Sequence, residues 1–214
     1  TLTAGAGADS LVTGAGADVI TAGAGDDTIT SASGGDTVYG GEGNNLITLS
    51  TSGTDHNVVT AGAGNDTIVT GGGLDDVTSG DGADSVNLGG GDGDVASLGD
   101  GNDTVIVSDI STGDTISGGA GTNTLRLDGG PVVDANLAHV TYVDVLALGN
   151  SADSITLGAY ALAAGVDTVT MGTGGDSVVV TTAFTSALVI TGSTGADTLQ
   201  VADSVLSSMT FAGG

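Results

Sequence analysis

The 214-residue sequence contains no cysteine, no tryptophan and no lysine, and it has only one proline, one arginine and five aromatic residues. Without cysteine and with only two histidines, sites for zinc or copper are poorly supported. So few aromatic residues leave little material for the bulky core of an ordinary globular protein. No apolar run approaches the roughly 18 residues that cross a membrane. A net charge of −25 disfavours nucleic acids and anionic membranes as partners.

Glycine and aspartate are the residues that the sequence has in abundance. There are 41 glycines, and every acidic residue except Glu42 is an aspartate. Short carboxylates favour tight turns, where they bond to nearby main chain or reach a metal, whereas glutamate favours helices. Val, Leu, Ile and Ala occur in short, regularly spaced runs, which a disordered acidic tail lacks.

A nine-residue repeat organises the first 127 residues. An Asp or Asn closes each glycine-rich loop at a nearly constant interval, with a short insertion before Asn57 and small slips later in the chain. An aliphatic residue follows two positions after nearly every one, from Leu11 to Leu125. The closing positions are Asp9, Asp18, Asp27, Asp36, Asn45, Asn57, Asp66, Asp75, Asp84, Asp94, Asp103, Asp114 and Asn123.

Each repeat predicts a loop followed by a short strand whose middle side chain faces inward. Such strands are stable only when they stack in parallel, so that they satisfy one another's main-chain groups. Two repeats make one coil, and coils stack about 4.8 Å apart. Every second loop residue then aligns, which produces two columns of carboxylates. The predicted fold is all-β, a right-handed parallel β-roll or β-helix solenoid.

Two columns of carboxylates at this spacing repel one another unless cations lie between them. Asp side chains, together with carbonyl groups that glycine leaves free to turn inward, provide only oxygen ligands, and these suit a hard cation such as Ca²⁺. We therefore predict several Ca²⁺ ions bound by Gly/Asp loops at the edges of the solenoid.

Segments 40–48 and 118–126 follow the pattern Gly-Gly-x-Gly-x-Asp-x-aliphatic-x, with Asn in place of Asp, and many other copies start with Ala, Ser or Leu. Over roughly residues 4–127 the chain thus resembles the RTX, or hemolysin-type, calcium-binding nonapeptide family. The resemblance implies that each Ca²⁺ lies between loops of adjacent coils. Asn45, Asn57 and Asn123 are neutral at the ligand position, which implies weaker sites beside them.

The resemblance also implies which groups hold the ions. The side-chain ligands would be Asp9, Asp18, Asp27, Asp36, Asp66, Asp75, Asp84, Asp94, Asp103 and Asp114. The main-chain ligands would include the carbonyl groups of Gly5, Gly7, Gly14, Gly16, Gly23, Gly25, Gly62, Gly64, Gly80, Gly82, Gly99 and Gly101.

A longer repeat replaces the nonapeptide after residue 127. Three segments end in loops closed by Asp153, Asp176 and Asp197. We predict that residues 128–214 continue the solenoid of residues 1–127 with wider coils of about 21 to 23 residues. One edge would keep the glycine loop, and the other would carry longer linkers. Pro131 marks the transition, because proline interrupts a ladder. The three Asp are weaker candidate metal ligands, with simple Asp turns as the alternative.

Groups that carry out catalysis are scarce, and we expect no enzymatic activity in these residues. There is no HExxH motif and no Gly-x-Ser-x-Gly motif. His56 is expected on a loop surface, and His139 is expected to be packed or at an edge. Arg126 is expected to pair with a neighbouring Asp.

The function that we favour is a secreted, calcium-binding structural domain of a bacterial cell-surface assembly, such as a surface layer, an adhesin stalk or an extracellular fibre. The composition of the sequence resembles that of RTX-type surface-layer proteins. The main alternative is the RTX secretion or folding domain of a toxin or enzyme exported by type I secretion, and a weaker one is ice binding by Thr-rich strands. We expect folding on Ca²⁺ outside the cell, self-association, and a longer parent protein.

Overall fold

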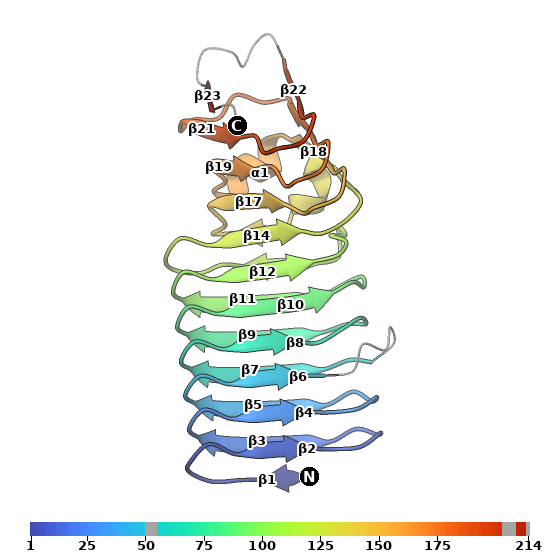
Figure 1. Cartoon of the computed structure of the whole chain (residues 1–214), viewed down its shortest axis with the longest axis vertical. Helices are drawn as coiled ribbons and strands as arrows, with labels where there is room; N and C mark the ends of the chain where they lie inside the picture. The colour runs from blue at the N-terminus through green and yellow to red at the C-terminus, as the bar shows by residue number, and fades with distance from the viewer. Residues whose placement is uncertain (50–54, 203–208, 213–214) are drawn as a thin grey trace.

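The computed structural model describes residues 1–49, 55–202 and 209–212. Coils stack along one axis from the N-terminus to the C-terminus (Figure 1). All strand pairs are parallel, and each strand pairs with the strand one coil away rather than with its neighbour in sequence. The predicted all-β parallel solenoid is therefore confirmed.

One wall of the coils is a sheet that has eight strands among the described residues. Its central strands have six residues because they continue into the glycine loops, so they are longer than the short strands that the sequence predicted. The strands in spatial order are β1 (Leu2–Thr3), β3 (Val19–Ala24), β5 (Thr37–Glu42), β7 (Val58–Ala63), β9 (Asp76–Asp81), β11 (Val95–Asp100), β13 (Thr115–Ser117) and β16 (Val140–Thr141).

The opposite wall is a sheet with eleven strands in the described part of the chain, and it runs the full height of the molecule (Figure 1). Its strands have three to five residues. They are β2 (Ser10–Val12), β4 (Thr28–Thr30), β6 (Leu46–Thr48), β8 (Thr67–Val69), β10 (Ser85–Gly89), β12 (Thr104–Val107), β14 (Thr124–Leu127), β17 (Val145–Leu148), β19 (Thr168–Thr170), β21 (Leu188–Thr191) and β23 (Met209–Ala212).

The core is a ladder of aliphatic side chains that project inward from both walls. Ile29 and Ile47 are paired in register across β4 and β6, and Ile20 and Val38 are paired across β3 and β5. All four are completely buried. Burial of a side chain of this size contributes about 1.5–3 kcal/mol. The middle residue of each strand therefore stabilises its coil, as the nine-residue pattern predicted.

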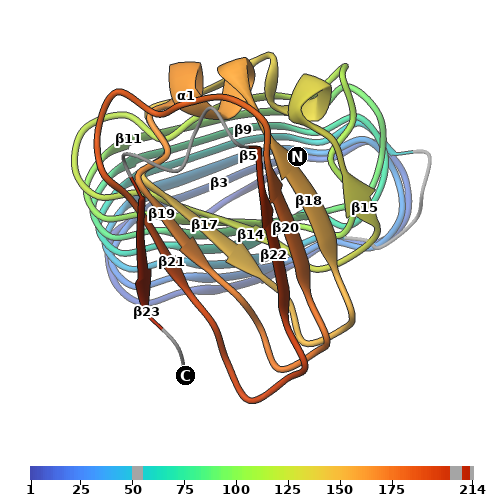
Figure 2. The same cartoon turned by 90° about the horizontal axis from the view of Figure 1, so that it is seen from above.

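The coils become three-sided after residue 127. A third sheet begins at β15 (Pro131–Val132) and continues through β18 (Ser154–Leu157), β20 (Ser177–Val180) and β22 (Thr198–Val201). The 3₁₀ helix η1 (Asp134–Leu137) and helix α1 (Ala159–Ala164) take the side on which the eight-stranded sheet ends (Figure 2). The sequence had predicted linkers at this position but neither the helices nor an additional sheet.

Asp134 holds two of these wide coils together. Its carboxylate accepts hydrogen bonds from the main-chain N–H groups of Gly158, Tyr160 and Ala161 at 2.8, 3.1 and 2.9 Å. The N–H groups at the start of a helix have no partner within it, so the carboxylate satisfies them from the coil below. No helix in the described part of the chain is long and apolar enough to cross a membrane.

Candidate metal-binding columns

The structure aligns the Asp and Asn residues that close the loops into two columns. The first column precedes the strands of the eleven-stranded sheet, and the second precedes those of the eight-stranded sheet. The first column contains Asp9, Asp27, Asn45, Asp66, Asp84, Asp103 and Asn123. The second column contains Asp18, Asp36, Asn57, Asp75, Asp94 and Asp114.

Hydrogen bonds of one kind join the members of each column. The main-chain N–H of Asp9 donates to Oδ1 of Asp27 at 2.7 Å, one coil above. The N–H groups of Asp66 and Asp84 likewise donate to Oδ1 of Asp84 and Asp103, both at 2.8 Å. One oxygen of each carboxylate thus fixes the spacing between coils, and the second oxygen remains for another role.

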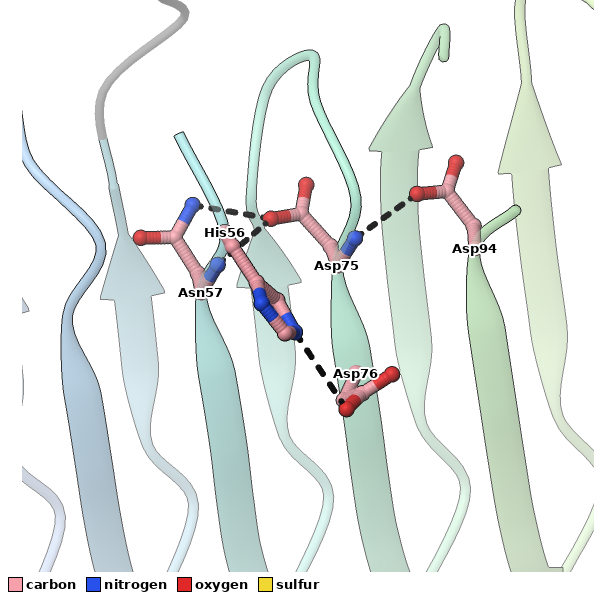
Figure 3. Close-up of polar contacts among 5 residues, drawn as sticks. All are labelled: His56, Asn57, Asp75, Asp76 and Asp94. Carbon is pink, nitrogen blue, oxygen red and sulfur yellow. Dashed lines mark hydrogen bonds and ion pairs between the residues drawn. The ribbon is translucent and has the colours of Figure 1, made fainter. Parts of the chain in front are cut away.

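Figure 3 shows the second column around Asn57. The main-chain N–H of Asp75 donates to Asp94 Oδ1 at 2.8 Å, and the main-chain N–H of Asn57 donates to Asp75 Oδ1 at 3.0 Å. The Asn57 side-chain amide donates to the same Asp75 oxygen at 2.9 Å. Three coils are connected in this way along one edge of the solenoid.

The second oxygen of most column carboxylates is buried and has no hydrogen-bond partner in the described structure. These side chains are almost fully buried, with exposed fractions of 0–2%. An unpaired buried polar atom costs about 1–3 kcal/mol, and more when it is charged. The oxygens are Oδ2 of Asp27, Asp36, Asp66, Asp75, Asp84 and Asp103.

The buried position of these groups disfavours their ionised form. Burial raises the pKa of Asp66 from 3.8 to about 6, with a further contribution from the charge of Asp84. Burial also raises the pKa of Asp94 to about 6, and it raises those of Asp75 and Asp103. Without a bound cation, the ionised carboxylates of the columns therefore destabilise the folded state at neutral pH.

The three asparagines of the columns carry an amide nitrogen where the aspartates carry their second oxygen, and this nitrogen finds hydrogen-bond acceptors without a cation. Asn45 Nδ2 donates to the carbonyl oxygen of Gly43 at 3.1 Å, in its own loop. Asn123 Nδ2 donates to the carbonyl oxygens of Gly119 and Tyr142 at 3.3 and 3.1 Å. None of the three amides is among the buried unpaired groups. A side-chain amide thus bonds the loop carbonyls that a cation would otherwise coordinate.

Glycine brings the main chain of adjacent loops together. Gly25 has a φ of 130°, a left-handed conformation that residues with a side chain rarely adopt. A Cβ atom at this position would lie 2.5 Å from the carbonyl oxygen of Gly7 in the coil below. Other predicted loop glycines with positive φ are Gly7, Gly16, Gly23, Gly62, Gly64, Gly80, Gly82, Gly99 and Gly101, whereas Gly5 and Gly14 lie outside that region.

The donor set fits a hard cation that accepts oxygen ligands. The loops bring together buried carboxylate oxygens and main-chain carbonyls, which is the chemistry that Ca²⁺ binds with six to eight ligands. In the described residues, no three Asp, Glu, His or Cys side chains converge on one point. A Ca²⁺ ion in these loops would therefore need carbonyl groups or water in addition to the column carboxylates.

Some predicted ligands have a different environment from the rest. Asp9 and Asp18 are partly exposed. Both oxygens of Asp114 accept hydrogen bonds, with Oδ1 bonded to the N–H groups of Gly93 and Asp94 and Oδ2 to that of Ser111, at 2.7–3.0 Å. The Asp114 carboxylate is thus already satisfied by main-chain donors, which distinguishes it from the column members that have an unpaired oxygen.

Two features of the columns escaped the sequence analysis. Asp144 continues the first column, because its Oδ2 accepts the main-chain N–H of Asn123 at 2.7 Å. The residues just before the column positions form an exposed ladder of their own. The N–H of Asn44 donates to Asp26 Oδ1 and that of Asn65 donates to Asn44 Oδ1, both at 2.7 Å. The sequence signal for this ladder is the Asp or Asn that recurs at positions 26, 44 and 65.

The remaining polar residues follow the predictions in part. His56 is exposed, and its Nε2 lies 3.4 Å from Asp76 Oδ2 (Figure 3). Arg126 pairs with a neighbouring aspartate as expected, with 2.7 Å between its Nε and Asp128 Oδ1. His139 is exposed, next to β16. In the described structure none of these groups lies in a column.

Comparison with protein families supports the metal-binding interpretation. The family described as RTX calcium-binding nonapeptide repeat matches four stretches of the chain, at residues 3–38, 30–49, 51–86 and 111–131. Asp94 and Asp103 lie between the matched stretches, and the structure places them in the same two columns. Comparison with curated proteins finds no match. The matched stretches are therefore similar to RTX calcium-binding repeats, and the structure folds them as a β-roll.

Proposed function

We propose that this chain is a Ca²⁺-dependent folding domain of a secreted protein. The observation that supports it most strongly is the stack of buried, unpaired Asp oxygens in both columns. In the nonapeptide region, the ligands would be the Asp residues of the two columns together with loop carbonyls. Adjacent carboxylates about 4.8 Å apart repel by about 1 kcal/mol in water and by several-fold more in a protein. Bound Ca²⁺ removes this repulsion, whereas low Ca²⁺ leaves it in place.

Folding would then be coupled to export. In the calcium-poor cytoplasm the columns would keep the chain open, which suits passage through a type I secretion channel. Outside the cell, Ca²⁺ would bind only the folded stack and stabilise it by mass action. A net charge of −25 agrees with a chain whose fold depends on added cations.

Circular dichroism tests this proposal directly. The full chain is expected to be largely unfolded in EGTA and to gain β structure on titration with Ca²⁺, with isothermal titration calorimetry counting several bound ions. The Asn positions should not add to that count. An unchanged β signal after complete chelation would contradict the proposal, because the fold would then not require the ions.

The biological setting that we favour is a structural part of a bacterial cell-surface assembly. The coils stack along one axis, with eight and eleven parallel strands in the two walls of the described chain, and such an extended arrangement suits a structural module. Sedimentation velocity with and without Ca²⁺ tests this role, and ordered self-association only with Ca²⁺ is the expected result. A monomer under both conditions would favour the alternative, an RTX module of a secreted toxin or enzyme.

A further inference from the structure

The wide coils contain a third column of aspartates. Asp153, Asp176 and Asp197 directly precede β18, β20 and β22, the side-by-side strands of the third sheet (Figure 2). The N–H of Asp153 donates to Asp176 Oδ1 at 2.9 Å, and the N–H of Asp176 donates to Asp197 Oδ1 at 3.1 Å. These bonds have the same direction as those in the two nonapeptide columns, although no RTX match extends beyond residue 131.

Two of these carboxylates have a buried oxygen without a partner. Oδ2 of Asp153 and Oδ2 of Asp176 make no hydrogen bond in the described structure, and the two residues are 5% and 1% exposed. Asp197 differs, because its Oδ2 accepts the N–H of Ser193 at 3.0 Å. The unpaired oxygens therefore belong to one pair of adjacent coils, which locates a single candidate site.

The charged neighbours of Asp153 are negative. Burial and then the charge of Asp176 raise the pKa of Asp153, Asp128 adds a smaller rise, and the Gly149 N–H and the Ser151 hydroxyl partly oppose it. The side chain of Arg126 is already paired with Asp128. The main chain of the loops is tightly stacked, since a Cβ atom at Gly174 would overlap the carbonyl oxygen of Ser151.

The main chain of these loops differs from that of the nonapeptide loops. None of Gly149, Gly172, Gly174, Gly175 and Gly195 has the positive φ that recurs in the nonapeptide loops of the described chain. The carboxylate column is thus retained while the loop conformation that accompanies it in the RTX repeats is not. A cation here would meet a different arrangement of carbonyl groups.

We propose that Asp153 and Asp176 form a Ca²⁺ site of their own in the wide coils, beyond the RTX repeats. Each residue contributes its unpaired Oδ2, and loop carbonyls and water complete the oxygen ligands that Ca²⁺ requires. The site ties β18 to β20 and stabilises the part of the solenoid in which the third sheet replaces the nonapeptide loops. This inference extends the proposed function to residues outside the family match.

The test compares the full-length double variant Asp153→Asn/Asp176→Asn with the control Asp167→Asn. Asparagine occupies the equivalent position of the other columns, so the double variant is expected to fold. Asp167 is an exposed residue that directly precedes β19, and its Oδ1 accepts a hydrogen bond from the Thr168 hydroxyl at 2.9 Å. In the described structure its carboxylate accepts no N–H group from the coil below, so it lies outside the bonded columns. Native mass spectrometry with Ca²⁺ is expected to count one ion fewer in the double variant and no change in the control.

Hydrogen exchange locates the effect along the chain. At a Ca²⁺ concentration about ten times the dissociation constant, amide protection in residues 149–180 is expected to be about tenfold higher in the wild type than in the double variant. An unchanged ion count, or equal protection of residues 149–180 in the two proteins, would overturn the inference. Residues 19–107 report separately on the nonapeptide sites, whose failure to respond would refute the proposed function instead.

Discussion

Replacing Asp66 with asparagine is expected to have opposite effects on stability with and without Ca²⁺. Asp66 Oδ1 accepts the main-chain N–H of Asn45 at 2.7 Å, and an amide oxygen can keep this bond. Its buried Oδ2 is unpaired. In the variant, an amide group that donates to loop carbonyls replaces this oxygen, as the amide of Asn45 does in the coil below.

The magnitude follows from the pKa of the carboxyl group. A pKa raised from 3.8 to about 6 corresponds to up to about 3 kcal/mol at neutral pH, and solvent near the loops reduces this to about 2 kcal/mol. Removal of the charge should therefore stabilise the metal-free fold by about 2 kcal/mol. With Ca²⁺ at about 100 times its dissociation constant, loss of one site removes about 3 kcal/mol of binding stabilisation, so the variant should be less stable than the wild type by about 1 kcal/mol net.

The assay is unfolding followed by circular dichroism, in Ca²⁺ and in metal-free buffer with a stabilising osmolyte that populates the folded state. In metal-free buffer the variant should need less osmolyte to fold than the wild type, which means that it is more stable. In Ca²⁺ its melting temperature should be lower, which means that it is less stable. The reverse substitution, Asn45→Asp, serves as the matched control and should change both quantities in the opposite direction. A variant with the same sign of effect in both buffers would refute the reasoning.

Three further predictions concern the loops and the wide coils. Gly25→Ala should destabilise the Ca²⁺-bound protein by at least about 1–3 kcal/mol in urea unfolding, because of its positive φ and the nearby carbonyl, whereas Gly175→Ala should have little effect. In metal-free protein, the raised pKa values of Asp66 and Asp94 should give stability that is fully present below about pH 4 and lost as the pH rises through about 6, measured as the osmolyte midpoint against pH. Asp134→Ala should lower the melting temperature and speed amide exchange at the start of α1, because three N–H groups lose their acceptor, and unchanged exchange there would contradict this role.

The fold of the nonapeptide region could be predicted from the sequence because one physical rule is repeated many times. An inward aliphatic residue two positions after each loop Asp determines strand, register and core together, and Ile29 and Ile47 pair as that rule requires. After residue 127 the rule fails, because the third sheet and the helices depend on contacts between distant residues. The bonds from Asp134 to the start of α1 span more than twenty positions and leave no periodic signal.

The candidate ligands could be listed from the sequence but not ranked, because residue type says nothing about how each oxygen is used. Asp84 and Asp114 occupy equivalent positions in the repeat. The structure leaves Asp84 Oδ2 buried and unpaired, whereas both oxygens of Asp114 are bonded to N–H groups. The local loop shape decides this difference, since Ser111 turns its N–H group toward Asp114.

Asparagine and cation are alternative solutions to one structural requirement in these columns. Every coil needs one oxygen to accept an N–H from the coil below, and both Asp and Asn provide it. The second side-chain atom is then either an amide nitrogen, which donates to a loop carbonyl, or a carboxylate oxygen, which needs a cation or, as at Asp114, an N–H donor from its own loop. Loops closed by Asn45, Asn57 and Asn123 should therefore stack without Ca²⁺, while loops closed by an Asp with an unpaired oxygen should not. The proposed Ca²⁺ requirement of this solenoid is thus set loop by loop, through the choice between an amide and a carboxylate.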